Sequence, residues 1–405
     1  MFLFLEGITS YDKIGIISNN RWEWATIAAA AYSLNASLVP MYEAQLPTDW
    51  RYILNDSGCS VVFCATEAIH EKVRTQVLPS TPTVTACFCL DAPMGDPCAF
   101  QTVMAEAITD DDGSLIQPPV QEDLANLIYT SGTTGHPKGV ELTHQNFVSN
   151  IKAGRTMVEN PRDLLKESDR SLAFLPWAHS YGQTCELWMS MSMGAGMGIC
   201  RGVPHILDDL QLVRPSILFA VPTLYKKVYD GVHNVMNHAS PLRKNLMQAA
   251  LDVGRMKADY DQGLRGPLTL AERLKFNLLD TLVLSKIRAR FGGNLRYGCV
   301  AGAACPVDVL NFMDSVGIPV CEGYGLTETS PIITLNTPEK RMKGSVGRPI
   351  GGVTVYIIDE GGNPSPPGEE GEICVVGPNV MKGYYNNKEA TDNVISLAPD
   401  GISRM

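Results

Sequence analysis

The chain has 405 residues, of which 45% are hydrophobic and 19% are charged, so it can bury a large core and exceeds the usual length of a single compact core. It carries 33 basic and 43 acidic residues, which gives a formal net charge of −10. Because a surface with this charge balance is not built to coat a polyanion, we do not expect nucleic acid as a partner. The length predicts two or more packed subdomains.

The cysteines favour a reducing compartment. There are eleven of them, an odd number, and the nearest approach to a zinc-type spacing, Cys87 with Cys89, is one residue short of CxxC. The apolar opening of residues 1–5 stops at Glu6 without a basic flank, which argues against a signal peptide, and no apolar run is long enough to span a bilayer. We therefore expect an intracellular protein, with peripheral membrane contact left open.

The first part of the chain alternates strand-like and helix-like segments. Strand-like runs occur at residues 14–17, 36–40 and 60–64, separated by an alanine-rich helical stretch at residues 22–34 and a polar stretch at residues 43–57. This alternation favours a parallel sheet that is covered by helices on both faces.

The segment at residues 91–123 is acidic and rich in turn-forming residues, so we expect a loop or linker there. Regular structure then resumes in strand-like runs at residues 124–129, 171–175, 216–221 and 295–301, with helices expected after Pro222 and at residues 268–291.

The character of the sequence changes again near residue 343. Two β-like runs, at residues 353–358 and 372–376, are separated by a turn-rich stretch, which is typical of antiparallel strands. We therefore predict an α/β fold with mostly parallel sheets covered by helices. The predicted division is α/β subdomains at residues 1–342 and a small antiparallel β-rich subdomain at residues 343–405.

A glycine-rich and hydroxyl-rich loop follows the strand predicted near residue 124. Residues 127–140 read LIYTSGTTGHPKGV, and such a loop offers a polyphosphate its backbone N–H groups, several hydroxyls and the ammonium of Lys138. It is not a Walker A loop, because Pro137 stands where that pattern needs glycine and Gly139 where it needs serine or threonine. For an isolated loop of this kind, a mobile surface turn is the plain alternative.

A second motif lies far downstream, where residues 323–331 read GYGLTETSP. Its glycines do not form a dinucleotide fingerprint, because Glu328 occupies the place of the third glycine. Gly325 lets the backbone pass close to a ligand, Tyr324 offers a flat face for a purine, and Thr327 supplies a hydroxyl. The carboxylate of Glu328 is a hard oxygen ligand that suits magnesium.

Together the two motifs resemble the signature segments of the AMP-binding, or adenylate-forming, superfamily, which includes acyl-CoA synthetases, firefly luciferases and peptide-synthetase adenylation domains. The resemblance implies that the first loop grips the β- and γ-phosphates of ATP. It assigns that role to Thr130, Ser131, Gly132, Thr133, Thr134, Gly135 and Lys138.

For the second motif, the resemblance implies that Tyr324 and Gly325 lie at the adenine, Thr327 meets the α-phosphate and Glu328 holds the metal. Lys138, Thr327 and Glu328 are thereby the expected catalytic residues.

Weaker matches add further candidates. By resemblance, His179 in the stretch FLPWAHS lies beside the substrate carboxylate, and Tyr225 gates an acyl tunnel. Gly302 and Ala303 in the stretch AGAA lie against the adenine, where bulky side chains would block close approach. A structural hydrogen bond for His179 and a core aromatic at a helix start for Tyr225 stay open as alternatives.

Residues 19–24, NNRWEW, and residues 39–42, VPMY, look like the long-chain acyl-CoA synthetase branch of the superfamily. That branch joins a long-chain fatty acid to ATP with Mg²⁺, releases pyrophosphate, and passes the acyl group from the adenylate to coenzyme A. The resemblance implies fatty acid and nucleotide as small-molecule partners. It also implies a location in the cytoplasm or on the cytosolic face of the endoplasmic reticulum or another organelle.

The family pattern continues beyond Asp400 and Gly401 to an aspartate that holds the ribose, a hinge, and a small domain with a catalytic lysine, none of which this sequence contains. We therefore expect a fragment or a mispredicted gene product, incomplete at the C-terminus and also at the N-terminus, with a naturally shortened pseudoenzyme as the lesser alternative. A lysine that neutralises developing charge contributes about 3–4 kcal/mol, so this chain alone is expected to be a poor ligase. Two rivals remain: an adenylating ligase for another acid, and a non-catalytic nucleotide-binding protein.

Overall fold

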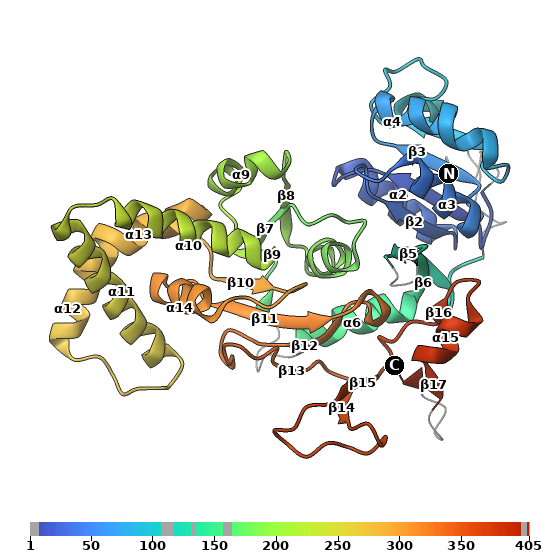
Figure 1. Cartoon of the computed structure of the whole chain (residues 1–405). Helices are drawn as coiled ribbons and strands as arrows, with labels where there is room; N and C mark the ends of the chain where they lie inside the picture. The colour runs from blue at the N-terminus through green and yellow to red at the C-terminus, as the bar shows by residue number, and fades with distance from the viewer. Residues whose placement is uncertain (1–7, 107–116, 132–134, 157–163, 398–402, 405) are drawn as a thin grey trace.

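The computed structural model describes residues 8–106, 117–131, 135–156, 164–397 and 403–404. Over these residues the strands form sheets of seven, five, four and two strands, with helices packed around them (Figure 1). The seven-stranded sheet is mostly parallel, the five-stranded sheet combines a parallel half with two antiparallel pairs, and the four-stranded sheet is antiparallel. The α/β fold expected from the sequence is therefore confirmed.

The seven-stranded sheet, here called the first sheet, has the strand order β16-β6-β5-β2-β1-β3-β4. Its strands are β1 (Lys13–Ile17), β2 (Ser37–Met41), β3 (Val61–Cys64), β4 (Ala86–Cys89), β5 (Leu124–Thr130), β6 (Lys138–Thr143) and β16 (Gly383–Tyr384). The first five in chain order pair in parallel, and β6 and β16 pair antiparallel at one edge.

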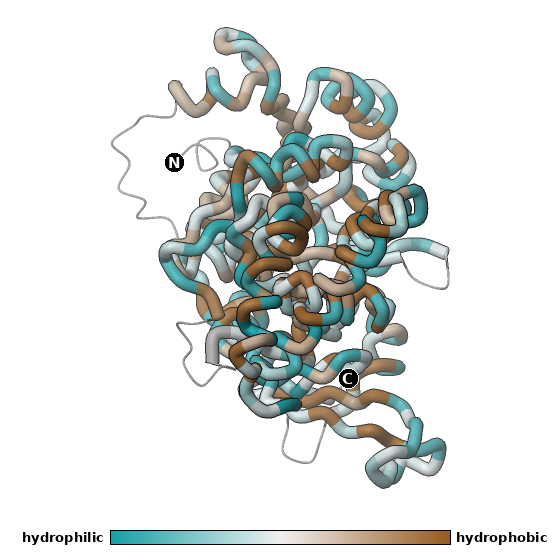
Figure 2. Tube along the Cα trace, turned by 90° about the vertical axis from the view of Figure 1, so that its left-hand side faces the viewer, coloured by the Kyte–Doolittle hydropathy of each residue, from teal (hydrophilic) through white to brown (hydrophobic). Residues whose placement is uncertain are grey.

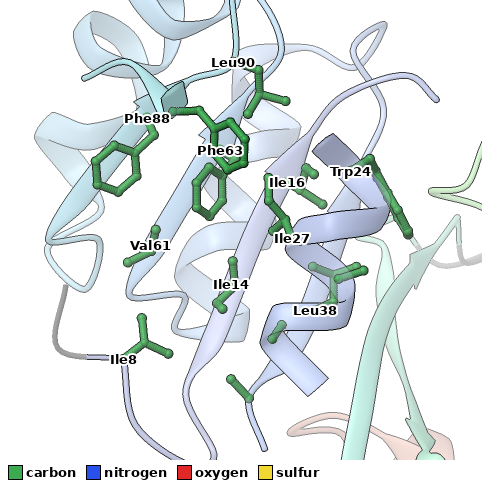
Figure 3. Close-up of a cluster of buried hydrophobic side chains, with 14 of the residues drawn as sticks. Ile8, Ile14, Ile16, Trp24, Ile27, Leu38, Val61, Phe63, Phe88 and Leu90 are labelled. Atoms are coloured by element: carbon green, nitrogen blue, oxygen red, sulfur yellow. The ribbon is translucent and has the colours of Figure 1, made fainter. Parts of the chain in front are cut away.

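Both faces of the first sheet are buried under packed elements. Because side chains alternate along each strand, the strands contribute residues to the core on each face. Ile14 and Ile16 of β1 point into one core cluster with helix α2 (Trp22–Ser33), as Figure 3 shows. Ile17 points to the opposite face, where it meets α3 (Pro47–Ser57). The parallel pairing explains why the strands read as continuous apolar runs.

The five-stranded sheet, here called the second sheet, has the order β13-β12-β11-β10-β9. Its strands are β9 (Ile217–Ala220), β10 (Tyr297–Val300), β11 (Val320–Gly325), β12 (Ile332–Leu335) and β13 (Arg348–Pro349). Helices α10 (Pro222–Asn237) and α14 (Val307–Val316) cover one face with a second core cluster. Figure 1 shows α10 to α13 extending away from the first sheet.

Residues 222–291, from α10 to η6, are called the helical arm below. After α10 it contains α11 (Pro241–Asp261), α12 (Leu270–Leu279), η5 (Asp280–Leu284), α13 (Ser285–Arg288) and η6 (Ala289–Phe291). The segments from α12 to η6 follow one another without a break.

The other strands are β7 (Arg170–Ala173), β8 (Gly196–Ile199), β14 (Thr354–Ile358), β15 (Glu372–Val376), β17 (Ser396–Leu397) and β18 (Ser403–Arg404). The other helical segments are α4 (Glu67–Lys72), η1 (Val73–Val77), η2 (Leu78–Ser80), α5 (Phe100–Glu106), α6 (His144–Thr156), η3 (Gly182–Trp188), α8 (Met189–Met193), η4 (Val203–His205), α9 (Ile206–Val213), η7 (Thr327–Thr329) and α15 (Lys388–Val394).

The structure corrects one expectation. The loop expected at residues 91–123 contains helix α5, because Phe100 and Val103, three residues apart, are both buried against the core of the first sheet. The flanking turn residues hide this short pattern in the sequence. All eleven cysteines are free thiols.

The β-rich segment after residue 343 does not form a sheet of its own throughout. Strand β13 belongs to the second sheet and β16 to the first, while β14, β15, β17 and β18 form the antiparallel sheet. The boundary at residues 342 and 343 therefore stays a prediction.

Trp24 offers a test of the core of the first sheet. Its ring is fully buried and meets the ring of Trp177 edge to face at 5.6 Å. Trp24→Ala is expected to lower the free energy of unfolding by about 3–5 kcal/mol, because it leaves a large cavity. Urea-induced unfolding followed by circular dichroism measures this change.

Trp22→Ala is the matched control, because Trp22 lies in the same helix and is 57% exposed. Its cost should stay below about 1 kcal/mol. Equal losses in the two variants would contradict the assignment of Trp24 to a tightly packed core.

Candidate functional site

The two sequence motifs meet at Tyr384 of strand β16. The Tyr384 hydroxyl donates a hydrogen bond to Glu328 Oε1 at 2.8 Å, and the Lys138 Nζ lies 5.0 Å from the centroid of the same ring. A cation at this distance from an aromatic face is attracted to the ring. Two segments almost two hundred residues apart in the sequence thus converge on one side chain.

The backbone around Tyr384 fixes this junction. The Met381 N–H donates to the carbonyl of Glu328, and the Tyr385 N–H donates to the carbonyl of Gly139, both at 2.8 Å. One short segment therefore connects the second motif to strand β6. Burial raises the pKa of the Tyr384 hydroxyl, and the adjacent Glu328 carboxylate raises it further, so the hydroxyl keeps its proton and acts as the donor.

The first motif is the connection of a β-hairpin. Thr130 at the end of β5 pairs directly with Lys138 at the start of β6. Ser131 and Gly135 are exposed, and Gly135 has a φ of 113°, a backbone conformation that favours glycine. Three further candidates of this loop lie outside the described residues: Gly132, Thr133 and Thr134.

In the second motif, close packing of the backbone demands a glycine. A Cβ on Gly325 would lie 1.8 Å from the carbonyl oxygen of Pro331, so no other residue fits between β11 and β12 without rearrangement. This tight approach leads into the single turn η7, which carries Thr327 and Glu328.

A cavity of about 290 Å³ opens beside the second motif. Its polar end is lined by six of the candidates expected from the sequence: His179, Gly302, Tyr324, Gly325, Thr327 and Glu328. Its remaining wall is mostly apolar. One part of this wall comes from strands of the second sheet and the other from residues outside that sheet: Ile217, Phe219, Tyr297, Cys299, Ile332 and Leu335, and Leu164, Leu165, Cys185 and Met189, respectively.

Hydrogen bonds order the polar end of the cavity. Ser180 is fully buried, and its hydroxyl lies 3.3 Å from that of Thr327. The Tyr181 N–H donates to His179 Nδ1 at 3.1 Å, so the neutral imidazole carries its proton on Nε2. His179 is exposed at the surface, but partial desolvation by the surrounding protein lowers the pKa of its imidazole.

The structure does not bring every candidate to this cavity. Tyr225 is fully buried in the core on the opposite face of the second sheet, against Gly298. The reason is the alternation along β9 and β10: Ile217 and Tyr297 point into the cavity, whereas Gly298 faces Tyr225. Ala303 is exposed on the loop after β10 and does not line the cavity either.

The described loop residues of the first motif also lie outside the cavity wall. Lys138 reaches the second motif through the ring of Tyr384, which bonds to Glu328 at the cavity's polar end. The arrangement therefore places a cation and a carboxylate on one tyrosine side chain at the polar end of an apolar chamber. Such a site suits a ligand with a charged polyphosphate and an apolar group.

Sequence reasoning missed two residues of this site. Tyr384 appears in the sequence only as part of a Gly-Tyr-Tyr stretch, and Ser180 only as the residue after His179. Neither has a spacing that identifies its partner, because the contacts to Glu328 and Thr327 arise from tertiary structure. The doubled tyrosine after a glycine is the only local signal for the first.

The AMP-binding enzyme family model matches residues 1–385. The chain is 29% identical to long chain acyl-CoA synthetase 7, peroxisomal, of Arabidopsis thaliana over 97% of this chain and 56% of that protein. It is 31% identical to long-chain-fatty-acid–CoA ligase 5 of Rattus norvegicus over 94% of this chain and 56% of that protein. The chain thus spans little more than half the length of these curated relatives.

Among solved structures, apo MatB from Rhodopseudomonas palustris superimposes with a TM-score of 0.71 at 22% identity, covering 99% of this chain and 66% of the other. The N-terminal domain of FACL13 from Mycobacterium tuberculosis gives a TM-score of 0.70 at 22% identity, covering 99% and 88%. At this sequence identity, the two structures show that the chain shares their fold. With its family match over residues 1–385 and its two motifs joined at Tyr384, the chain belongs to the AMP-binding enzyme family.

Proposed function

We propose that the protein activates a long-chain fatty acid with ATP and Mg²⁺ to an acyl-adenylate, and passes the acyl group to coenzyme A. The observation that carries this proposal is the continuity of one cavity, which runs from Thr327 and Glu328 into an apolar interior. A polar reaction centre at the mouth of an apolar chamber fits an acid whose carboxylate reacts while its hydrocarbon tail is buried.

The depth of the chamber favours a long tail. Tyr297 and Ile217 pair across β10 and β9, five residues before Gly302 at the polar end. At about 3.3 Å per residue, β10 alone spans roughly 10 Å from Tyr297 to Val300, two residues before Gly302. The Tyr297 hydroxyl donates to the carbonyl of Leu164 and closes this end. The names of the curated relatives, which are long-chain ligases, support the same substrate class.

In the proposed reaction, a carboxylate oxygen bonds to the α-phosphorus of ATP and the bond from that phosphorus to pyrophosphate breaks. Lys138 and the hydroxyl of Thr327 stabilise the negative charge that builds on the phosphates. His179 stays neutral, and its Nε2–H can donate to the carboxylate without quenching its charge. Positioning and charge neutralisation suffice, so no side chain acts as a nucleophile.

Magnesium fits the proposal through a single protein ligand. Among the described residues, no group of three acidic, histidine or cysteine side chains could hold a metal by itself. Mg²⁺ in nucleotide sites commonly binds one or two carboxylates together with substrate phosphates, and Glu328 offers a partly exposed carboxylate held in place by Tyr384. When bound, the ion supplies charge neutralisation to the phosphates.

A single-turnover assay tests the function. The purified chain is incubated with Mg²⁺ and ATP labelled at the α-phosphate, and separately with a sixteen-carbon, an eight-carbon or an aromatic acid. Because each buried methylene adds binding, labelled adenylate from the longest acid should exceed the others at least about tenfold.

Ile217→Trp should abolish most of this preference, because the ring fills the deep end of the chamber, while ATP affinity is unchanged. Leu212→Trp is the control, since Leu212 is 71% exposed. Nucleotide binding without adenylate from any acid would overturn the proposal in favour of a non-catalytic binding protein. A preference for the aromatic acid would point to a ligase for another substrate.

The two charged residues are expected to act differently on the nucleotide. Glu328→Gln should reduce the Mg²⁺-dependent part of ATP affinity, whereas Lys138→Ala should weaken ATP at every Mg²⁺ concentration and leave AMP almost unaffected. Each loss should be about tenfold or more, because both interactions involve a charge. Calorimetric titration with ATP and AMP across Mg²⁺ concentrations measures them, and unchanged affinities in both variants would place the nucleotide elsewhere.

Tyr384→Phe isolates the hydroxyl that bonds to Glu328. The ring under Lys138 remains, and only the hydrogen bond to the Glu328 carboxylate is lost. ATP affinity should therefore fall about tenfold. Tyr385→Phe is the matched control, because the next residue's ring faces Lys13 instead. The same titration compares them, and equal affinities would contradict a positioning role for Tyr384.

A further inference from the structure

The helical arm carries a row of exposed leucines. Leu270, Leu274, Leu278 and Leu282 recur every four residues along α12 and η5, and are 76%, 63%, 60% and 44% exposed. Residues four apart lie on one side of a helix, so they form a continuous apolar strip, here called the leucine ridge. The opposite side of the same helix packs on α11 through a separate core cluster, so the ridge has no packing role in the fold.

The ridge leads into a broad groove between α10, α11 and the segment from η5 to η6. The groove has a volume of about 830 Å³, and Leu282 belongs to both its wall and the ridge. On the α11 side, Leu246 lines the groove and is 40% exposed, and Leu242, one turn earlier, is 79% exposed. Apolar surface is therefore continuous across two helices.

Cations surround this apolar surface. Lys227, Arg243, Lys286 and Arg290 line the groove, and no aspartate or glutamate lines it. Within the described part of the chain, these four form no ion pair, whereas neighbouring Arg288 is paired with Asp280 at 2.7 Å.

The charge of the arm is opposite to that of the whole chain. Residues 222–291 contain twelve lysines and arginines against six aspartates and glutamates, a net charge of +6 in a chain of net charge −10. Figure 2 views the molecule from the side on which the arm lies, and brown hydrophobic residues alternate with teal hydrophilic ones along the helices that face the viewer.

We propose that this face of the arm docks on the surface of an anionic lipid bilayer. The ridge leucines enter the boundary between headgroups and acyl chains, while the groove cations contact lipid phosphates and carboxylates. An apolar helical strip flanked by lysine and arginine is the pattern of helices that lie in a membrane interface. Among the described residues, no helix is both long and apolar enough to cross a bilayer, so the contact is peripheral.

A protein partner fits this face less well. Binding surfaces for proteins are enriched in tyrosine, tryptophan and arginine and depleted in lysine, and leucine is under-represented among their strongest contacts. The ridge instead consists of leucines alone, and lysines supply half of the groove's cations. It also protrudes on a helix, which suits insertion into a soft interface.

Vesicle co-sedimentation tests the proposal with the purified chain. Vesicles of phosphatidylcholine with about 30% phosphatidylserine should bind at least roughly tenfold more tightly than pure phosphatidylcholine, and added salt should weaken the binding. The combined variant Leu270→Ser, Leu274→Ser and Leu278→Ser should lose most of it.

A matched control replaces equally exposed apolar residues far from the arm: Leu46→Ser, Met94→Ser and Val120→Ser, which are 65%, 70% and 57% exposed in the native chain. It should bind like the native protein. A charge pair tests the groove, with Lys286→Glu and Arg290→Glu against Arg74→Glu and Lys388→Glu as the control, whose side chains are 60% and 86% exposed. Only the first pair should weaken binding to phosphatidylserine vesicles.

A spectroscopic measurement keeps the test independent of sedimentation. Leu274→Trp places a fluorophore on the ridge, and its emission should shift to shorter wavelength on phosphatidylserine vesicles relative to the emission in buffer. The proposal would be overturned if the ridge variant bound vesicles as tightly as the native protein does. It would also be overturned if the native protein bound neither kind of vesicle, or if the emission of Leu274→Trp did not shift. A ridge variant that changed only the oligomeric state would overturn it too, because that result assigns the face to contacts between copies of the chain.

Discussion

The site depends on the return of residues 381–385 to the first sheet. The hydrogen bond from Tyr384 to Glu328 and the two backbone bonds from Met381 and Tyr385 connect the second motif to β6, at distances of 2.8 Å. Buried Asn150 of α6, the helix that follows β6, adds a second connection, because its side-chain amide donates to the carbonyls of Thr329 and Ile332. Strand β16 pairs with β6 through two residues only, so side-chain hydrogen bonds such as those of Asn150 contribute to the site's alignment.

The charges at this junction are arranged so that neither is neutralised by the other before a ligand arrives. Lys138 lies over the face of Tyr384, and Glu328 accepts from its hydroxyl. The aromatic ring therefore separates the ammonium from the carboxylate and holds both. A cation that faces a ring retains most of its capacity to bind an anion, because the ring carries no net charge. An ion pair between the two would have weakened both toward phosphate and metal.

The sequence predicts the fold well where local signals are strong. The strands β1, β5, β9 and β10 read as apolar runs, and α2 as an alanine-rich helix. Helix α5 was missed because its two buried residues stand between turn-forming stretches.

In the site, Tyr324, Thr327 and Glu328 of the second motif line one cavity, whereas the contact of Tyr384 with Glu328 arises where the chain returns to the first sheet, which no local pattern encodes. For Tyr225, the sequence shows the secondary structure but not the side of the sheet. Its position at a helix start is visible in the sequence, but which face of the second sheet it packs on depends on the register of β9 and β10.

One helix connects the reaction chamber to the helical arm. Helix α10 begins at Pro222, directly after β9, whose Ile217 and Phe219 line the chamber, and it ends beside the groove, where Val235 and His238 contribute to the wall. Its sixteen residues span about 24 Å as one hydrogen-bonded rod. Leu224 and Tyr225 hold its first turn in the core of the second sheet. Val228 continues this packing in the second turn, so the helix fixes the position of the groove relative to the chamber wall.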